Sequence, residues 1–216
     1  MTTRTMTVLG IDAGSTTVRA AEHLLQRVLG EVLGAAPERF ACTHVVRGDH
    51  PHAALSVTVD AAELGLVEPV APGAPGELRE PGADGGLAAL SNRLGIAELG
   101  LAWQHERYGP PSLAAGAAFT AGELAARSTG RAVVFPGVDA LVGTLTVREV
   151  LARSAVDEIV VVGGPPATLD DAVDTRDFVR PEWRDGRLVL AVTPAGGGVL
   201  APFEVPNPTA CCADHA

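Results

Sequence analysis

One apolar stripe, between residues 17 and 33, constrains the fold of this chain more than any other feature. Apolar residues recur there every three or four positions, which is typical of a helix that is buried along one side. They are Val18, Ala21, Leu24, Leu25, Val28, Leu29, Val32 and Leu33. Ser15 or Thr16 is expected to cap the start of this helix, and Gly34 is expected to end it. A short apolar strand, residues 6–11, comes directly before it.

The segments that follow the helix alternate in a different way. Residues 39–60 switch between apolar and polar positions on both sides of RGDHPH, so they predict a β-hairpin with a loop of about six residues. The chain therefore opens as β-α-β-β. Residues 67–86 are rich in Pro, Gly, Glu and Ala, which favours a surface loop. Residues 87–127 are rich in Ala, and we expect them to be mostly helical.

The third quarter of the chain predicts a strand-helix-strand unit. Its helix is opened by the capping box of Thr146 and Glu149, and it stands between apolar runs at 131–135 and 157–164. Two strands joined by a helix usually form a parallel pair with a right-handed crossover. We therefore expect these two runs to pair with each other.

The closing stretch completes the prediction of the fold. Asp185-Gly186 between two apolar runs predicts a C-terminal β-hairpin. The fold class expected from these elements is α+β, or mixed α/β, with a helical middle. We expect a single globular domain over residues 1–205 and an extended tail over residues 206–216.

Composition excludes several functions. The formal net charge is −10, which argues against a nucleic-acid partner because phosphate binding needs a basic surface. All 16 basic residues are arginine, so the chain has no lysine for a P-loop nucleotide site or for a Schiff base with PLP. No Gly-x-Gly-x-x-Gly follows a strand, so a nicotinamide cofactor is not expected either.

Compartment is inferred from segments that the chain lacks. No apolar run reaches the roughly 20 residues that span a membrane, and the N-terminus reaches Asp12 too early for a signal peptide. Three cysteines, two of them adjacent, do not form a disulfide framework. We therefore expect a soluble, cytoplasmic protein with no membrane partner.

The stretch TVLGIDAGSTT, residues 7–17, resembles the first phosphate loop of the actin-like ATPase superfamily. That superfamily includes sugar kinases, Hsp70-type chaperones and the ATP-driven activators of radical dehydratases. The resemblance implies that Asp12 helps to organise a metal ion and that Gly14, Ser15 and Thr16 bring N–H groups and hydroxyls to phosphates. In that family the loop turns between two antiparallel strands, whereas here a helix is expected to follow.

Two interpretations of this turn follow from the residues themselves. Small residues before a helix can hold a phosphate or a carboxylate, because backbone N–H groups approach the anion closely there. The same residues are also typical of a plain strand-to-helix turn in which Ser15 caps the helix. The first interpretation gives a ligand site at Gly14, Ser15 and Thr16.

Cysteine and histidine gather in two short segments, which is the least random feature of the composition. They are Cys42, His44, His50 and His52 in one segment and Cys211, Cys212 and His215 in the other. Mixed sulfur and nitrogen ligands suit zinc or another transition metal, and adjacent thiols also exchange or oxidise. The alternative is a small buried Cys42 beside exposed, unconnected histidines and a tail without a role.

His105 is the one candidate for a general base. It lies in WQHERY, where Trp, His, Glu, Arg and Tyr come together. The alternative is a helix that is anchored by its aromatic residues, with His105 facing water.

Two functions therefore remain open. The first is a binding or accessory protein that carries a transition metal or reactive thiols through the cysteine and histidine clusters. The second is a small metabolic enzyme that binds an anionic ligand at the Gly14–Thr16 turn and near His105.

Overall fold

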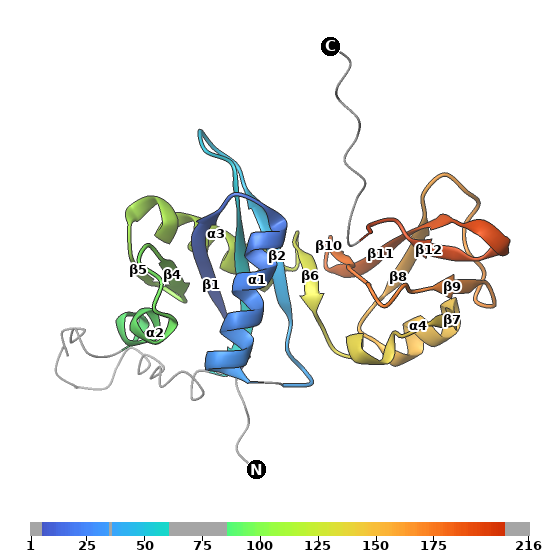
Figure 1. The fold of residues 1–216 in the computed structure, drawn as a ribbon, viewed down its shortest axis with the longest axis horizontal. Helices are drawn as coiled ribbons and strands as arrows, with labels where there is room; N and C mark the ends of the chain where they lie inside the picture. Colours follow the sequence, from blue (N-terminus) through green and yellow to red (C-terminus); the bar gives the residue numbers. More distant parts are fainter. Residues whose placement is uncertain (1–5, 35, 61–85, 206–216) are drawn as a thin grey trace. The chain divides into compact units, whose positions relative to one another are not determined.

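The structure, a computed structural model, describes residues 6–34, 36–60 and 86–205. The described residues form four α-helices and twelve β-strands, so the fold is α+β as expected (Figure 1). Almost all of the surface loop expected at 67–86 lies outside the described residues, and so does the whole tail 206–216. No helix in the described part of the chain is both long enough and apolar enough to cross a membrane.

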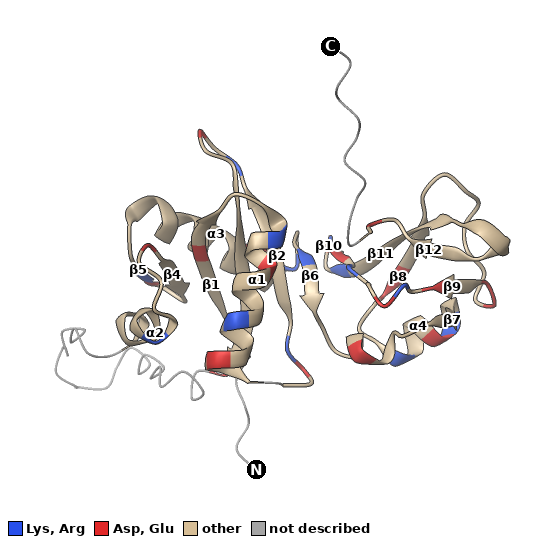
Figure 2. Cartoon of the chain, in the orientation of Figure 1, with Lys and Arg blue, Asp and Glu red and all other residues tan. Residues whose placement is uncertain are grey.

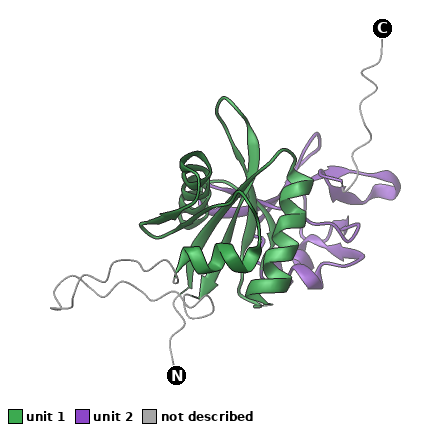
Figure 3. Cartoon of the chain, turned by 60° about the vertical axis from the view of Figure 1, so that its left-hand side comes forward, with its two compact units in different colours: residues 1–135 green, residues 136–216 purple. Residues whose placement is uncertain are grey.

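The chain divides into two compact units, Met1–Phe135 and Pro136–Ala216 (Figure 3). The sequence analysis treated residues 1–205 as one globular domain. Each unit has buried apolar residues of its own, for example Leu25 in the first and Leu190 in the second. The two units are therefore described separately.

The first unit is an antiparallel sheet with helices on both of its faces. Its strands lie in the order β5-β4-β1-β3-β2-β6, and each pairs with its neighbours in the antiparallel sense. The elements are β1 Met6–Ser15, α1 Val18–Val28, the π-helical turn η1 Leu29–Leu33, β2 Ala41–Val46, β3 His52–Asp60, α2 Leu87–Leu94, β4 Gly100–Trp103, β5 Glu106–Tyr108, α3 Pro111–Ala126 and β6 Arg131–Val134.

The helix α1 forms where the apolar stripe predicted it, but its cap differs. Thr17, and not Ser15 or Thr16, takes the extended N-cap conformation and accepts a hydrogen bond from the Ala20 N–H at 3.1 Å. The strand β1 continues to Ser15 and the helix starts only at Val18, so the cap falls on Thr17, the residue directly before the helix. The helical segment ends at Gly34, as expected, with a φ of 65°.

The end of the helical segment is closed by a buried arginine. Arg39 is only 1 % exposed, and its guanidinium donates to the Leu33 and Gly34 carbonyls at 3.0 and 2.6 Å. Carbonyls at a helix C-terminus lack partners within the helix, so a cation there is favourable. This contact ties α1 to the start of the hairpin, which is formed by β2 and β3 as predicted.

The two faces of the first sheet differ in the size of their side chains. Large apolar residues such as Leu9, Leu55 and Trp103 belong to the hydrophobic core shared with α1 and α2. On the opposite face the strands carry small residues, and a β-carbon at Gly10 or Gly100 would overlap the backbone of α3. The helix α3 therefore lies directly on the sheet, on the face opposite α1 (Figure 1).

The middle of the chain is mostly helical, as predicted, but it also contains two strands. Within residues 87–127 the strands β4 and β5 form a hairpin between α2 and α3. Its turn contains Gln104, with a φ of 51°, and His105. The helix predicted around WQHERY is therefore wrong, because Trp103 is buried in the sheet and the next residues reverse the chain.

The second unit is a mixed sheet with one helix. The strands β10, β11, β12, β9 and β7 follow one another, and β8 pairs with β11 in parallel. Its elements are η2 Val138–Ala140, β7 Thr144–Thr146, α4 Val147–Arg153, β8 Glu158–Val161, β9 Ala172–Asp174, β10 Glu182–Arg184, β11 Arg187–Pro194, η3 Gly196–Gly198 and β12 Leu200–Pro202.

Local sequence signals in the second unit predicted α4, β8 and the hairpin of β10 and β11, but they did not predict β7, β9 or β12, and they gave β8 a wrong partner. The capping box of Thr146 and Glu149 is present at the start of α4, and β10 and β11 form a hairpin at Asp185-Gly186. Both turn residues have positive φ, as a type I′ turn requires. The parallel partner of β8 is β11, whereas β6 pairs with β2, so the parallel pair predicted for 131–135 and 157–164 is wrong.

Candidate functional site

An irregularity in β1 creates the most unusual side-chain environment of the first unit. Ile11 lies opposite Leu55 and Ser15 lies opposite Ala53, so residues 12–14 of β1 face a single residue of β3. Gly14 has a φ of 62°, which suits glycine. Such a bulge changes the direction of the side chains next to it and is common near functional sites.

Asp12 lies in this bulge and is completely buried. Its Oδ1 accepts a hydrogen bond from the Gly14 N–H at 2.8 Å, and its Oδ2 lies 2.8 Å from His52 Nε2. The α3 residue next to the carboxylate is Gly116, where a β-carbon would overlap Asp12 Oδ2. A buried carboxylate is costly unless it is paired and hydrogen-bonded, and here it is both.

His52, at the start of β3, is held between Asp12 and its own loop. Its Nδ1 lies 2.8 Å from the carbonyl oxygen of His50, which can only accept a hydrogen bond. Burial lowers the pKa of His52, but the hydrogen bonds to His50 and Asp12 and the charge of Asp12 outweigh it, so the pKa is raised above 6.5. Two donating nitrogens correspond to a cationic imidazolium, and the side chain is 18 % exposed.

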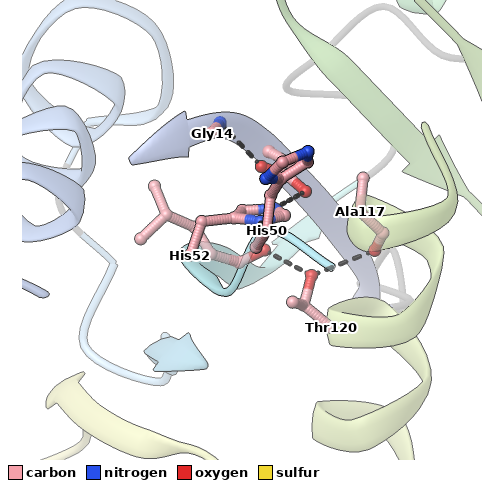
Figure 4. A network of polar contacts seen from close by, with 7 residues as sticks. Gly14, His50, His52, Ala117 and Thr120 are labelled. Carbon is pink, nitrogen blue, oxygen red and sulfur yellow. Dashed lines mark hydrogen bonds and ion pairs between the residues drawn. The ribbon is translucent and has the colours of Figure 1, made fainter. Parts of the chain in front are cut away.

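Figure 4 shows how α3 is fixed beside this pair. The Thr120 hydroxyl donates to the Leu55 carbonyl at 2.7 Å and can also donate to the Ala117 carbonyl at 3.0 Å. Leu55 belongs to β3 and Ala117 to α3, so Thr120 joins the helix to the strand that carries His52. This contact keeps Gly116 in register with Asp12.

The predicted ligand site at Gly14, Ser15 and Thr16 forms the rim of the same region. Gly14 is engaged with Asp12, Ser15 is half-buried and Thr16 is exposed. The first turn of α1 contains no acidic residue and begins with exposed residues that include Arg19. Arg19 was not singled out from the sequence, although a basic residue at a helix start is unusual and gives a usable signal.

The residues of the first cysteine and histidine cluster occupy different surroundings. Cys42 and His44 are buried on β2, and His44 Nε2 lies 2.6 Å from Ser56 Oγ. Burial lowers the pKa of His44 to about 4, with Glu123 opposing this weakly, so the ring is neutral. His50 is exposed in the hairpin loop. Within the described ranges no group of three or more His, Cys, Asp or Glu side chains could hold a metal ion.

The remaining predicted site residues do not join this region. His105 is exposed in the turn between β4 and β5. Cys211, Cys212 and His215 lie outside the described residues. The pairing of Asp12 with His52 was missed, although an acid inside an apolar strand signals that a partner must come from elsewhere.

Comparison with known proteins gives no relative for this chain. It matches no protein-family model, and no curated protein or solved structure is significantly similar to it. The connection after Gly14 also differs from the phosphate loop that residues 7–17 resemble, because β1 passes into α1 and not into a second strand.

Proposed function

We propose that the first unit binds a small anion, a phosphate or a carboxylate, where β1 and β3 meet the Gly14–Thr16 turn. The observation that carries the proposal is the completely buried Asp12 carboxylate that holds His52 2.8 Å away. A fixed carboxylate keeps the imidazole in its charged form and in one orientation. A cation of this kind is a suitable donor to a ligand oxygen.

In this proposal a ligand takes the place of the His50 carbonyl as the hydrogen-bond acceptor of His52 Nδ1. The hydrogen bond from His52 Nδ1 to the His50 carbonyl lies in an exposed part of the hairpin loop. An anionic oxygen is a stronger acceptor than a carbonyl oxygen, so a bound ligand would replace His50 in this contact. The Asp12 side of the ring is unaffected by the exchange.

The surroundings of the turn also favour an anion. The start of α1 presents N–H groups, carries no acidic side chain and has the exposed Arg19 in its first turn. The chain as a whole has a net charge of −10, so this local preference is not a general property of the surface. In this interpretation Ser15 and Thr16 supply hydroxyl contacts at the rim.

Sulfate is a suitable test ligand because its charge stays constant across the pH range in which histidine titrates. Asp12→Asn and His52→Gln are each expected to weaken sulfate binding about tenfold in isothermal titration calorimetry, by removing a charge-assisted hydrogen bond. His105→Gln, an exposed histidine in another hairpin, is the matched control and should bind like the wild type.

The pH dependence separates this site from nonspecific attraction. Sulfate binding should weaken as the pH rises through the raised pKa of His52, and this loss should be absent in His52→Gln. Unchanged affinity in both variants, with far-ultraviolet circular dichroism showing intact folds, would contradict the proposal.

Transition-metal or thiol chemistry is the second proposed function. It rests on the sequence, since all three cysteines and four of the six histidines fall in the segments 42–52 and 211–215. Elemental analysis of the untagged protein is expected to find zinc or another transition metal that a Cys211→Ser, Cys212→Ser double variant loses. Metal-free preparations of both proteins would reject this function.

A further inference from the structure

The edge of the first sheet leaves a groove beside α3 that the anion site does not use. The groove has a volume of about 640 Å³ and is lined by Arg107, Tyr108 and Gly109 on one side and by Ala114, Ala115 and Ala118 on the other. Small-molecule sites usually have volumes of roughly 300–1,000 Å³. The groove therefore has the size of a site for a compact organic ligand.

The groove exists because the residues of α3 that face the sheet edge are small. Ala114, Ala115 and Ala118 carry single methyl groups, and β5 is the last strand of the sheet on this side. Figure 2 shows that α3 is almost without charged residues, since Glu123 is the only one between Pro111 and Ala126. The helical wall of the groove is thus apolar and uncharged.

Arg107 gives the groove a single positive charge. It lies opposite Ala102, and Ala102 shares its face of the sheet with Gly100, which touches α3. Arg107 is therefore on the α3 side of β5. Its Nη1 donates to the Gln104 and Glu106 carbonyls at 3.0 and 2.7 Å, which fixes the guanidinium beside the hairpin turn.

The charge of Arg107 is not neutralised by the protein around it. Among the residues that the structure describes, no carboxylate forms an ion pair with this guanidinium, although Arg131, Arg148 and Arg153 each have one. Arginine presents several donors in a planar fork that matches a carboxylate or a sulfonate. An apolar wall with one unpaired, oriented arginine is complementary to an apolar molecule that carries one acidic group.

We propose that the groove between β5 and α3 binds a small organic acid, with its aromatic or aliphatic body against Ala115 and Ala118 and its single anionic group on Arg107. This site is separate from the one formed by Asp12 and His52, so either proposal can fail without the other. A second copy of the chain would bury the same edge and is distinguished by the test.

The probe is 8-anilinonaphthalene-1-sulfonate, an aromatic sulfonate whose fluorescence rises in apolar sites, and N-phenyl-1-naphthylamine is its uncharged counterpart. Arg107→Gln should weaken the sulfonate about tenfold and the uncharged probe by less than about twofold. Ala115→Trp fills the groove and should weaken both probes by about tenfold or more.

Matched controls use residues of the same kind elsewhere. Arg93→Gln removes an exposed arginine that also donates to a backbone carbonyl, and Ala125→Trp places the same bulk on an exposed position of α3 outside the groove. Both controls should bind the two probes like the wild type.

Three results would overturn the proposal. The first is an equal effect of Arg107→Gln on the charged and the uncharged probe. The second is a molecular mass that increases to that of a dimer at higher protein concentration, together with weaker probe binding, because a second copy of the chain would then occupy the edge. The third is a set of amide chemical-shift changes, on addition of the sulfonate, that excludes residues 107–109 and 114–118.

Discussion

The carboxylate of Asp12 is enclosed on every side that the structure describes. Gly14 donates to one oxygen, His52 contacts the other, and Gly116 leaves the space that the carboxylate fills. Interiors packed this closely do not absorb an added methyl group without strain. The residue type at position 116 is therefore determined by the contact with Asp12 of β1 and not by helix propensity.

Gly116→Ala should lower the free energy of unfolding by about 1–3 kcal/mol, because its β-carbon would overlap Asp12 Oδ2. Gly122→Ala on the same helix is the control. No atom lies within 4 Å of a β-carbon there, so it should raise the free energy of unfolding by about 0.5–1 kcal/mol. Urea unfolding measures both, and equal effects would contradict the packing described here.

His44 should make the protein sensitive to acid, in contrast to His52. Its pKa falls to about 4 on burial, from 6.5, so the unfolded chain takes up a proton that the folded chain excludes. Stability is therefore lost as the pH falls, by roughly 3 kcal/mol across this range. Urea unfolding of His44→Asn should show a shallower loss between pH 6.5 and pH 4 than the wild type. The control is His105→Asn, which changes an exposed histidine. If the unfolding free energy of His44→Asn falls with pH as steeply as that of this control, the assignment is refuted.

At the scale of the element, the sequence predicted those segments whose signal is local. The stripe from Val18 to Leu33, the hairpin of β2 and β3, and the capping box of α4 depend on neighbouring residues and were all found. The short strands β4 and β5 were not, because runs of three or four residues have too little periodicity to separate them from helix. The partner of β8 depends on residues far along the chain, which local patterns do not specify.

The start of α1 gives a direct test at this scale. Thr17→Ala should lower the free energy of unfolding by about 1 kcal/mol, since its hydroxyl accepts the Ala20 N–H. Thr16→Ala, at one of the two positions that the sequence predicted as the cap, should change it by less than about 0.5 kcal/mol. Thermal unfolding of the two variants measures the difference, and the reverse order would place the cap at residue 16.

At the scale of the molecule, the two units have separate sets of buried residues. The large cluster that contains Leu9, Leu55 and Trp103 lies entirely within the first unit. The candidate site could be predicted from the sequence only in part. Gly14 and its neighbours are visible as a motif, but Asp12 and His52 are 40 positions apart and meet only through the register of β1 and β3.

Separate cores should give separate unfolding. Leu25→Ala in the first unit and Leu190→Ala in the second each remove a buried leucine and should cost about 2–5 kcal/mol. Hydrogen exchange followed by mass spectrometry should show faster exchange mainly in the unit that carries the substitution. Equal acceleration throughout the chain in both variants would mean that the units unfold together.

The most direct test of the central claim is the pKa of His52, measured by NMR titration with and without sulfate. The account predicts a pKa above 6.5 in the protein alone and a further rise with sulfate, because the anion prefers the imidazolium form. Asp12→Asn should lower both values. A pKa at or below 6.5 that sulfate leaves unchanged would contradict the claim that Asp12 and His52 form an anion-binding site.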